Sequence, residues 1–347
     1  MNEATIVILT AMNLEYSAVR ARLSDVAVQM HPKGTRFEIG YLNGCRVALA
    51  LTDKGNQPAA VLTERAIAEF DPAAVLFVGV AGALQPHLVL GDVVVATWVY
   101  AYHGATSQDD GLTARPRGWE LSHPAHQIAA HVDRVGDWAR GLPDGSPPPR
   151  VHFGPIAAGE IAHYSAVSDA RQWLREHYSD AIAVEMEAAG VAQAGHHNNA
   201  LPTIMVRGIS DYADMSKSAT DDAGWQPRAV ANAAAFAAAL AVALAEELGT
   251  GNTSSRTGAT RGDGGPFNLA MPNSHVGVQG ERVTVHGGIH LGGPAPSSGT
   301  AAVETSGPGI RSDWRRRALI WVREAFRGIT DLAAGVATIM TAARSVM

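Results

Sequence analysis

Two glutamates interrupt an otherwise apolar stretch of this chain. Residues 181–194 read AIAVEMEAAGVAQA, with Glu185 and Glu187 on either side of Met186. A carboxylate is costly to bury unless it is paired or hydrogen-bonded, so its place beside a core-like run needs a reason. The pattern predicts a strand that emerges from the core and leads into a helix. Both carboxylates are therefore candidates for contact with a polar ligand.

Two more carboxylates follow strand-like runs. Glu15 lies in the first turn of a helix expected from Asn13, directly after the run IVILT. Its alternative role is structural, because an acid in the first turn complements the helix dipole. Asp211 follows Ser210 at the end of MVRGISD, where it could act as a general acid or cap a following helix. Arg207 is either the electrostatic partner of Asp211 or a surface charge.

A glycine-containing connection joins two further apolar runs in residues 75–97, VLFVGVAGALQPHLVLGDVVVAT. We expect Gly79 and Gly82 to form a tight turn, whose N–H groups either approach a ligand or simply connect packed strands. The spacing is not the G-x-G-x-x-G dinucleotide fingerprint. Because strand ends gather at one edge of an open α/β sheet, these four segments together predict one shared site.

Short apolar runs alternate with helical patterns over the first 248 residues. Strand-like runs occupy residues 4–10, 45–51, 74–80, 92–97, 151–157, 181–185 and 203–207. Helical patterns occupy residues 13–23, 57–70, 166–177, 187–197 and 226–248. This alternation predicts an α/β domain whose largely parallel or mixed sheet is covered by helices.

Composition limits the class of protein. The chain has 347 residues, 46% of them hydrophobic, and can bury a large core. A single cysteine, Cys45, excludes an intramolecular disulfide, and the N-terminus lacks the pattern of a signal peptide. No uncharged apolar stretch approaches the roughly 20 residues that span a bilayer. The 14 histidines show no metal-ligand spacing. We expect a cytoplasmic protein with neither a metal nor another cofactor.

Charge and composition both change near residue 249. Residues 251–347 hold ten arginines, no lysine and six acids, whereas the preceding part holds 17 basic and 27 acidic residues. That acidic body is a poor general nucleic-acid binder. The Gly- and Ser-rich segment 249–272 predicts a flexible linker, and a second linker is expected at 294–310. Between them, 273–293 predicts a strand–turn–strand motif or else a Gly-rich linker. An arginine-rich amphipathic helix is expected at 311–345, for oligomerisation, membrane-surface anchoring or docking on the body.

Residues 1–248 resemble the nucleoside phosphorylase/nucleosidase superfamily, most closely its methylthioadenosine/S-adenosylhomocysteine nucleosidase branch. The matching segments occur in the order TAMNLEYSAV, GVAGAL with GDVVVAT, YAYH, AVEMEAAGVAQ and VRGISDYAD. The resemblance implies a three-layer αβα sandwich with a mixed central sheet, and a homodimer. It also implies hydrolysis of the N-glycosidic bond of a purine, chiefly adenine, nucleoside or nucleotide. A phosphate-dependent phosphorylase and a catalytically inactive nucleoside sensor are the alternatives.

The same resemblance implies roles for individual residues. Asp211 protonates or hydrogen-bonds the purine N7 and is oriented by Ser210. Glu187 holds the ribose hydroxyls, and Glu15 positions and deprotonates the attacking water. A carboxylate at Glu15 would repel phosphate, which favours hydrolysis over phosphorolysis. Further substrate contacts are implied for Val80, Ala81, Gly82, Ala162, His163, Glu185 and Met186.

Two positions depart from the family pattern. Val80 stands where the nucleosidases have a small polar residue, and Ala162 stands where an aromatic side chain stacks on the base. His163 and Tyr164 follow it. We therefore expect an altered base pocket, and the substrate stays open among methylthioadenosine, S-adenosylhomocysteine, adenosine, AMP and ATP.

Residues 273–293 also resemble the short bacterial amyloid signalling motifs that link effector domains to NLR-type ATPases. An unpaired strand–turn–strand can template a matching copy through backbone hydrogen bonds. The resemblance implies an NLR-type partner and a role for the nucleosidase domain as an immune effector.

Overall fold

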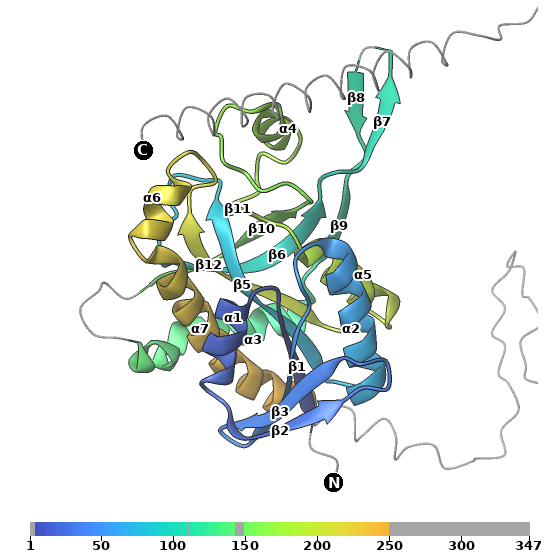
Figure 1. Ribbon diagram of the computed structural model, residues 1–347, viewed down its shortest axis with the longest axis vertical. Helices are drawn as coiled ribbons and strands as arrows, with labels where there is room; N and C mark the ends of the chain where they lie inside the picture. Colours follow the sequence, from blue (N-terminus) through green and yellow to red (C-terminus); the bar gives the residue numbers. More distant parts are fainter. Residues whose placement is uncertain (1–3, 110, 143–148, 250–347) are drawn as a thin grey trace, which may run out of the picture. The chain divides into compact units, whose positions relative to one another are not determined.

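The computed structural model describes residues 4–109, 111–142 and 149–249 (Figure 1). The predicted linkers, the predicted strand–turn–strand motif at 273–293 and the predicted helix at 311–345 lie outside the described residues. They stay predictions, as do the domain boundaries drawn from them.

A mixed sheet of ten strands forms the centre of the domain. Its strands are β1 (Thr5–Thr10), β2 (Ser24–Met30), β3 (Arg36–Leu42), β4 (Cys45–Leu51), β5 (Ala74–Ala83), β6 (Val93–Ala101), β9 (Arg117–Glu120), β10 (Val151–Ala158), β11 (Ala183–Glu185) and β12 (Thr203–Asp211). They lie in the order β11-β10-β6-β12-β5-β1-β4-β3-β2, with β9 beside β6. A separate hairpin pairs β7 (Ala105–Gln108) with β8 (Gly111–Ala114).

One end of the sheet closes on itself. β11 pairs with β10 in parallel and also with β5 in antiparallel fashion, through Ala183 opposite Ala83 and Val184 opposite Gly82. The strands β5, β12, β6, β10 and β11 therefore form a closed ring. This closure brings the carboxyl ends of β5, β11 and β12 together, where the sequence places its polar side chains.

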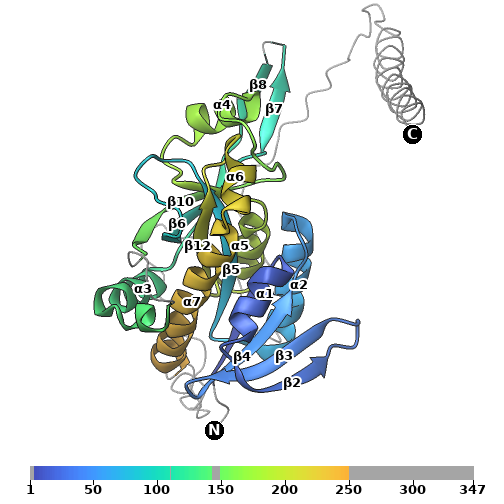
Figure 2. The same cartoon turned by 60° about the vertical axis from the view of Figure 1, so that its left-hand side comes forward.

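Helices cover both faces of the sheet (Figures 1 and 2). The helices are α1 (Asn13–Arg20), α2 (Asn56–Phe70), α3 (His123–Val135), α4 (Asp169–His177), α5 (Ala188–His197), α6 (Lys217–Asp222) and α7 (Trp225–Gly249), with a 3-10 turn at Asp137–Gly141. One layer contains α1, α3 and α7, and the other contains α2 and α5. The predicted αβα sandwich with a mixed sheet is confirmed.

Alternation along the strands creates the two halves of the core. In β1, Ile6 and Ile8 pack in the cluster that contains Phe236 of α7, whereas Val7 and Leu9 pack in the cluster that contains α2 and α5 side chains. All four strand residues are fully buried. A strand with both faces covered reads as a continuous apolar run, which is why IVIL has no polar residue.

The long helix α7 is part of this core. It is long and apolar enough to cross a membrane by length and composition, yet most of its apolar window is buried inside the domain. Its contacts are with β12, β5, α1 and α3. Burial of this kind is typical of the core helix of a globular domain, which passes the same composition test.

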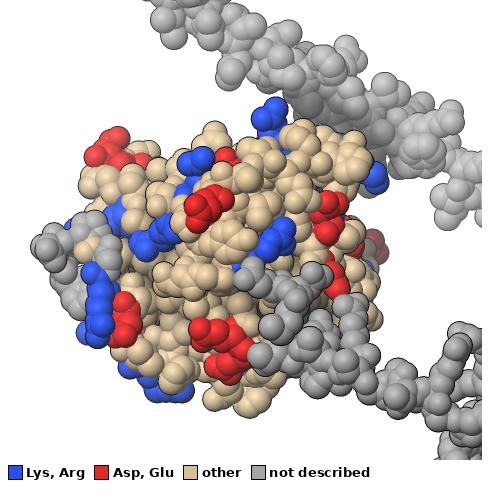
Figure 3. Space-filling view, turned by 90° about the horizontal axis from the view of Figure 1, so that it is seen from below, with Lys and Arg blue, Asp and Glu red and all other residues tan. Residues whose placement is uncertain are grey.

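Charged side chains of both signs are scattered over one face of the domain. On the face drawn in Figure 3, Lys and Arg side chains are interspersed with Asp and Glu among other residues. A further group of charged side chains lines a pocket at the ends of the strands.

Candidate active site

A pocket of about 750 Å³, open solvent at its mouth included, lies at the carboxyl ends of β1, β5, β11 and β12. The structure brings together all eleven residues that the sequence assigned to the site. They are Glu15, Val80, Ala81, Gly82, Ala162, His163, Glu185, Met186, Glu187, Ser210 and Asp211. Strand ends from four separate parts of the chain thus meet at one place, as the sequence predicts.

Glu15 is held by backbone N–H groups from two elements. One carboxylate oxygen accepts hydrogen bonds from the N–H groups of Ala11 and Met12, each at 2.9 Å, and thereby caps α1. The other accepts from the N–H of Val80 in β5, also at 2.9 Å. Glu15 is only 2% exposed. It therefore has a structural role and a place in the pocket at once, and the two readings of the sequence are compatible.

Burial raises the pKa of Glu15 above its ordinary value of 4.5, against the lowering effects of Arg207 and the three backbone N–H groups. A carboxylate with a raised pKa is a better proton acceptor near neutral pH than an exposed glutamate. The position of Glu15 thus suits a general base.

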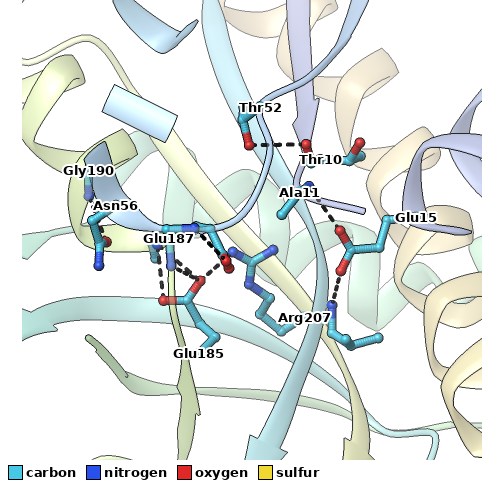
Figure 4. Close-up of polar contacts among 12 residues, drawn as sticks. Thr10, Ala11, Glu15, Thr52, Asn56, Glu185, Glu187, Gly190 and Arg207 are labelled. Atoms are coloured by element: carbon cyan, nitrogen blue, oxygen red, sulfur yellow. Dashed lines mark hydrogen bonds and ion pairs between the residues drawn. The ribbon is translucent and has the colours of Figure 1, made fainter. Parts of the chain in front are cut away.

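Arg207 is neither a surface charge nor the partner of Asp211, so both predictions for it were wrong. It is 1% exposed, its Nη2 donates to Oε2 of Glu185 at 2.6 Å, and its guanidinium lies 4.2 Å from the ring centre of Phe77. Arginine at the middle of a strand is ordinarily a solvated residue. Here it is a buried counter-ion for the carboxylates (Figure 4).

The glycines of β5 also correct the sequence prediction, because Gly79 and Gly82 lie within the strand and not in a turn. A Cβ on Gly79 would collide with the carboxylate of Glu15 and lie 2.7 Å from Nη1 of Arg207. A Cβ on Gly82 would lie 2.8 Å from Oδ1 of Asp211. These glycines make room for the charged side chains, and their role is packing of the site.

Glu185 and Glu187 have different environments. Oε2 of Glu185 accepts from the N–H of Glu187 and from Arg207, and both of its oxygens accept from the N–H of Ala188 (Figure 4). Its carboxylate caps α5, and its oxygens already accept hydrogen bonds from protein donors. Glu187 accepts one protein hydrogen bond, from the N–H of Gly55 at 3.1 Å. It keeps acceptor capacity for a ligand, which fits the predicted contact with ribose.

Burial and then the neighbouring Glu185 raise the pKa of Glu187 to about 7. The desolvated carboxylate and a like charge nearby both disfavour ionisation. Around neutral pH this group can accept a hydrogen bond from a hydroxyl or donate one to it.

Asp211 is surrounded by donors. Its Oδ2 accepts from Oγ of Ser210 at 2.9 Å and from Nζ of Lys217 at 2.6 Å, and its Oδ1 accepts from the N–H of Ala213 at 2.9 Å. It does not cap a helix, since α6 begins at Lys217 after Ser216. Lys217 was not predicted from the sequence, because it lies six residues after Asp211 and has no spacing signal of its own.

His163 forms part of the pocket wall. Its Nε2 lies 3.0 Å from the hydroxyl of Tyr102, and both side chains are buried. Burial, together with Arg171 and His103, lowers the pKa of His163, so its ring is neutral around pH 7. Ala162 and the exposed Tyr164 line the same wall. The wall is thus built from a neutral imidazole and small or peripheral side chains.

A family model of the phosphorylase superfamily matches residues 5–242. The chain belongs to the phosphorylase superfamily. Among solved structures it is similar to the 5′-methylthioadenosine/S-adenosylhomocysteine nucleosidase of Neisseria meningitidis, in complex with methylthio-immucillin-A. The identity is 28%, the match covers 68% of this chain and 97% of that chain, and the TM-score is 0.58.

Two more superfamily structures match at 25% identity and a TM-score of 0.58. The match to the futalosine hydrolase of Helicobacter pylori covers 97% of that chain and 68% of this one. The match to the nucleosidase of Streptococcus pneumoniae with the transition-state inhibitor MT-ImmA covers 99% of that chain and 69% of this one. The predicted superfamily and fold are confirmed. The roles of individual residues stay predictions.

Within the described residues of this phosphorylase-superfamily domain, no group of three or more His, Cys, Asp or Glu side chains is arranged to hold a metal ion.

The raised pKa of Glu187 predicts a pH-dependent stability effect. An acid whose pKa is raised on folding contributes its full stability below about pH 4.5 and loses it as the pH rises through 7. Glu187→Gln removes the buried charge, so it should increase the free energy of unfolding at pH 8 by about 1–3 kcal/mol and have little effect at pH 5. Urea titrations at the two pH values measure this, with Glu120→Gln on the surface as control. An equal effect of Glu187→Gln at both pH values would contradict the assignment.

Proposed function

We propose that this protein hydrolyses the N-glycosidic bond of an adenine nucleoside or nucleotide and releases the free base. The observation that carries the proposal is the position of Glu15. It is a buried carboxylate with a raised pKa, fixed by three N–H groups, in the pocket that also contains Asp211 and Lys217. The similarity to nucleosidases supports the same reaction.

Loss of the base is assisted by Asp211. As the bond between C1′ and N9 breaks, its electron pair moves onto the purine, which must gain a proton. The ammonium of Lys217 gives a proton to Oδ2 of Asp211 across their 2.6 Å contact, and Asp211 passes it on to N7, so its carboxylate is regenerated. Lys217 regains its proton from solvent, to which Glu15 returns the proton that it takes from the attacking water. Ser210 and the N–H of Ala213 fix the plane of the carboxylate. The base therefore occupies the part of the pocket between Asp211 and the wall of Ala162 and His163.

The sugar occupies the glutamate-rich part. Departure of the base leaves positive charge on C1′ and the ring oxygen, which nearby carboxylates stabilise. Glu187 accepts from the ribose hydroxyls and Met186 packs against the ring. Glu15 takes one proton from water while the water oxygen bonds to C1′, which completes the hydrolysis.

Phosphorolysis is less well suited to this pocket. A phosphate beside C1′ would meet Glu15 and, as Glu187 ionises above about pH 7, a second carboxylate, and like charges repel each other in a buried site. The buried cation nearest to them, Arg207, is already paired with Glu185. Water, which is neutral, meets no such repulsion.

The alternative outside the enzymes is a catalytically inactive protein that senses nucleosides. It would bind the same ligands through Glu187 and the base wall without releasing the base. Tight purine binding in a calorimeter without any base release would favour it.

The wider role is also a proposal. We infer a cytoplasmic effector that forms a homodimer through its nucleosidase domain and connects to an NLR-type partner through residues 273–293. The sequence pattern of that segment supports it. A synthetic 273–293 peptide should form fibres that bind thioflavin. A peptide that stays monomeric at high concentration would contradict the templating role.

The hydrolase proposal predicts base release without phosphate. The full chain should release adenine in phosphate-free buffer, and Asp211→Asn should lower kcat at least 1000-fold because it removes the proton donor. Chromatographic measurement of free base checks both, and Asp222→Asn on the exposed side of α6 is the matched control. Base release that requires phosphate would overturn the hydrolase assignment, and an active Asp211→Asn variant would overturn the acid role of Asp211.

Lys217 is predicted to be a positioning and proton-supplying residue. Lys217→Met should lower kcat at least tenfold with a smaller change in KM, because the base still binds but its proton is not replaced. Lys217→Arg keeps the cation and should recover part of kcat. Equal losses in Lys217→Met and Lys217→Arg, or a change in KM as large as the change in kcat, would limit Lys217 to a structural role.

A further inference from the structure

A second cavity lies beside the active-site pocket. Two segments of the chain contribute residues to both the pocket and the cavity, and within each segment these residues are close in sequence. Met12 and Glu15 line the pocket, whereas Asn13 and Tyr16, on another face of the same helical turn, line the cavity. Likewise Lys54 lines the pocket, whereas Thr52 and Asp53 line the cavity. The two spaces are therefore neighbours, and one turn of α1 and the residues after β4 form their common boundary.

The cavity is basic. Lys33 and Arg36 from the β2–β3 connection and Arg65 from α2 line it, and Asp53 is the one acid in its lining. Lys54 adds a fourth cation at the boundary with the pocket. Among the described residues, none of these four cations takes part in an ion pair.

This concentration of charge is unusual for the domain, because the chain before residue 251 has 17 basic and 27 acidic residues. A solvated surface would not need to gather unpaired cations in one hollow. Nη1 of Arg65 donates to Oγ1 of Thr35 at 2.9 Å, which fixes one guanidinium against the β2–β3 connection. Arginine and lysine placed in this way suit a phosphate chain, because each phosphate presents charged oxygens as acceptors.

The position of the cavity relative to a bound nucleoside follows from Glu187. Its carboxylate accepts from the N–H of Gly55, so Lys54 adjoins the part of the pocket where the ribose is proposed to lie. Asp211 and Lys217 mark the base end. A substituent that leaves the ribose away from the base would therefore point toward Lys54 and the boundary with the basic cavity.

We propose that the substrate is a purine nucleoside 5′-phosphate, and that Lys33, Arg36 and Arg65 bind the outer phosphates of a di- or triphosphate chain. The inference rests on the proposed nucleosidase function and names its substrate class. The phosphates are not transferred. Water adds to C1′, the base leaves with its proton, and the second product is the ribose that still carries its phosphate chain.

The same cations could instead bind a free phosphate ion that serves as the nucleophile. The cavity lies beside Asn13 and Tyr16, not beside the face of the turn from which Glu15 enters the pocket. Inorganic phosphate bound there would lie away from C1′. It should compete with nucleotides and leave cleavage of adenosine unchanged, and phosphate-stimulated cleavage of adenosine would contradict this placement.

The test compares adenosine, AMP, ADP and ATP as substrates of the full chain in phosphate-free buffer. The value of kcat/KM should be at least 100-fold higher for ATP than for adenosine, with AMP between them. The double variant Lys33→Gln/Arg36→Gln should lower the ratio of ATP to adenosine at least tenfold, because both side chains are exposed and their loss leaves the core intact. Arg134→Gln on α3 is the matched control and should keep the ratio within twofold. Equal use of adenosine and ATP, or a ratio that the double variant does not change, would overturn the proposal.

Binding separates this proposal from the hydrolase assignment. Calorimetry on the Asp211→Asn variant should show ATP binding at least tenfold more tightly than adenosine, and the double variant in that background should abolish the difference. Release of adenine from adenosine without preference for ATP would refute the phosphate site and leave the hydrolase assignment standing. ATP binding that depends on Lys33 and Arg36, with no base release from any substrate, would refute the hydrolase assignment alone. Equal affinity for adenosine and ATP would refute the phosphate site directly.

Discussion

Three glutamates share one buried region of this protein, and the buried cation beside them is Arg207. It pairs with Glu185 at 2.6 Å, and its charge lowers the pKa values of Glu15 and Glu187 against the effect of burial. Removing one partner from a buried ion pair typically costs 3–5 kcal/mol, because an uncompensated charge is left behind. The carboxylates of the site therefore depend on one side chain that does not line the pocket itself.

The sheet is built around this requirement. The pairing of β11 with both β10 and β5 places Glu185 next to β12, where Arg207 lies on the ring of Phe77. Gly79 leaves the space that the Glu15 carboxylate and the guanidinium occupy. The result is a pocket with chemically distinct parts, in which a carboxylate with a bound ammonium faces the proposed base. The carboxylates of Glu15 and Glu187, held by backbone N–H groups, face the proposed sugar. Bond cleavage between base and sugar needs that division.

The sequence predicts the buried strands β1, β4, β5, β6, β10, β11 and β12, five of the helices and the meeting of the polar strand ends, because buried strands have continuous apolar runs and motifs at their ends are local. It misses the half-exposed strands β2 and β3, which lack such a run, and the helix α3. It does not predict the environment of Arg207, since the pairing of β12 with β5 and the closure of β11 are long-range contacts. Nor does it place Gly79 and Gly82 within a strand, because glycine most often signals a turn. Lys217 and the cations around Arg65 were not predicted either, because only the folded chain brings Lys217 to the pocket and gathers Lys33, Arg36 and Arg65 around the second cavity.

The central claim is that the pocket directs water, activated by Glu15, to the anomeric carbon. Turnover in water enriched in oxygen-18 tests this most directly, with mass spectrometry of the sugar and base products after a single turnover. The account predicts one labelled oxygen on C1′ of the sugar and none in the free base. A sugar product without the label, or one that carries phosphate at C1′, would contradict it.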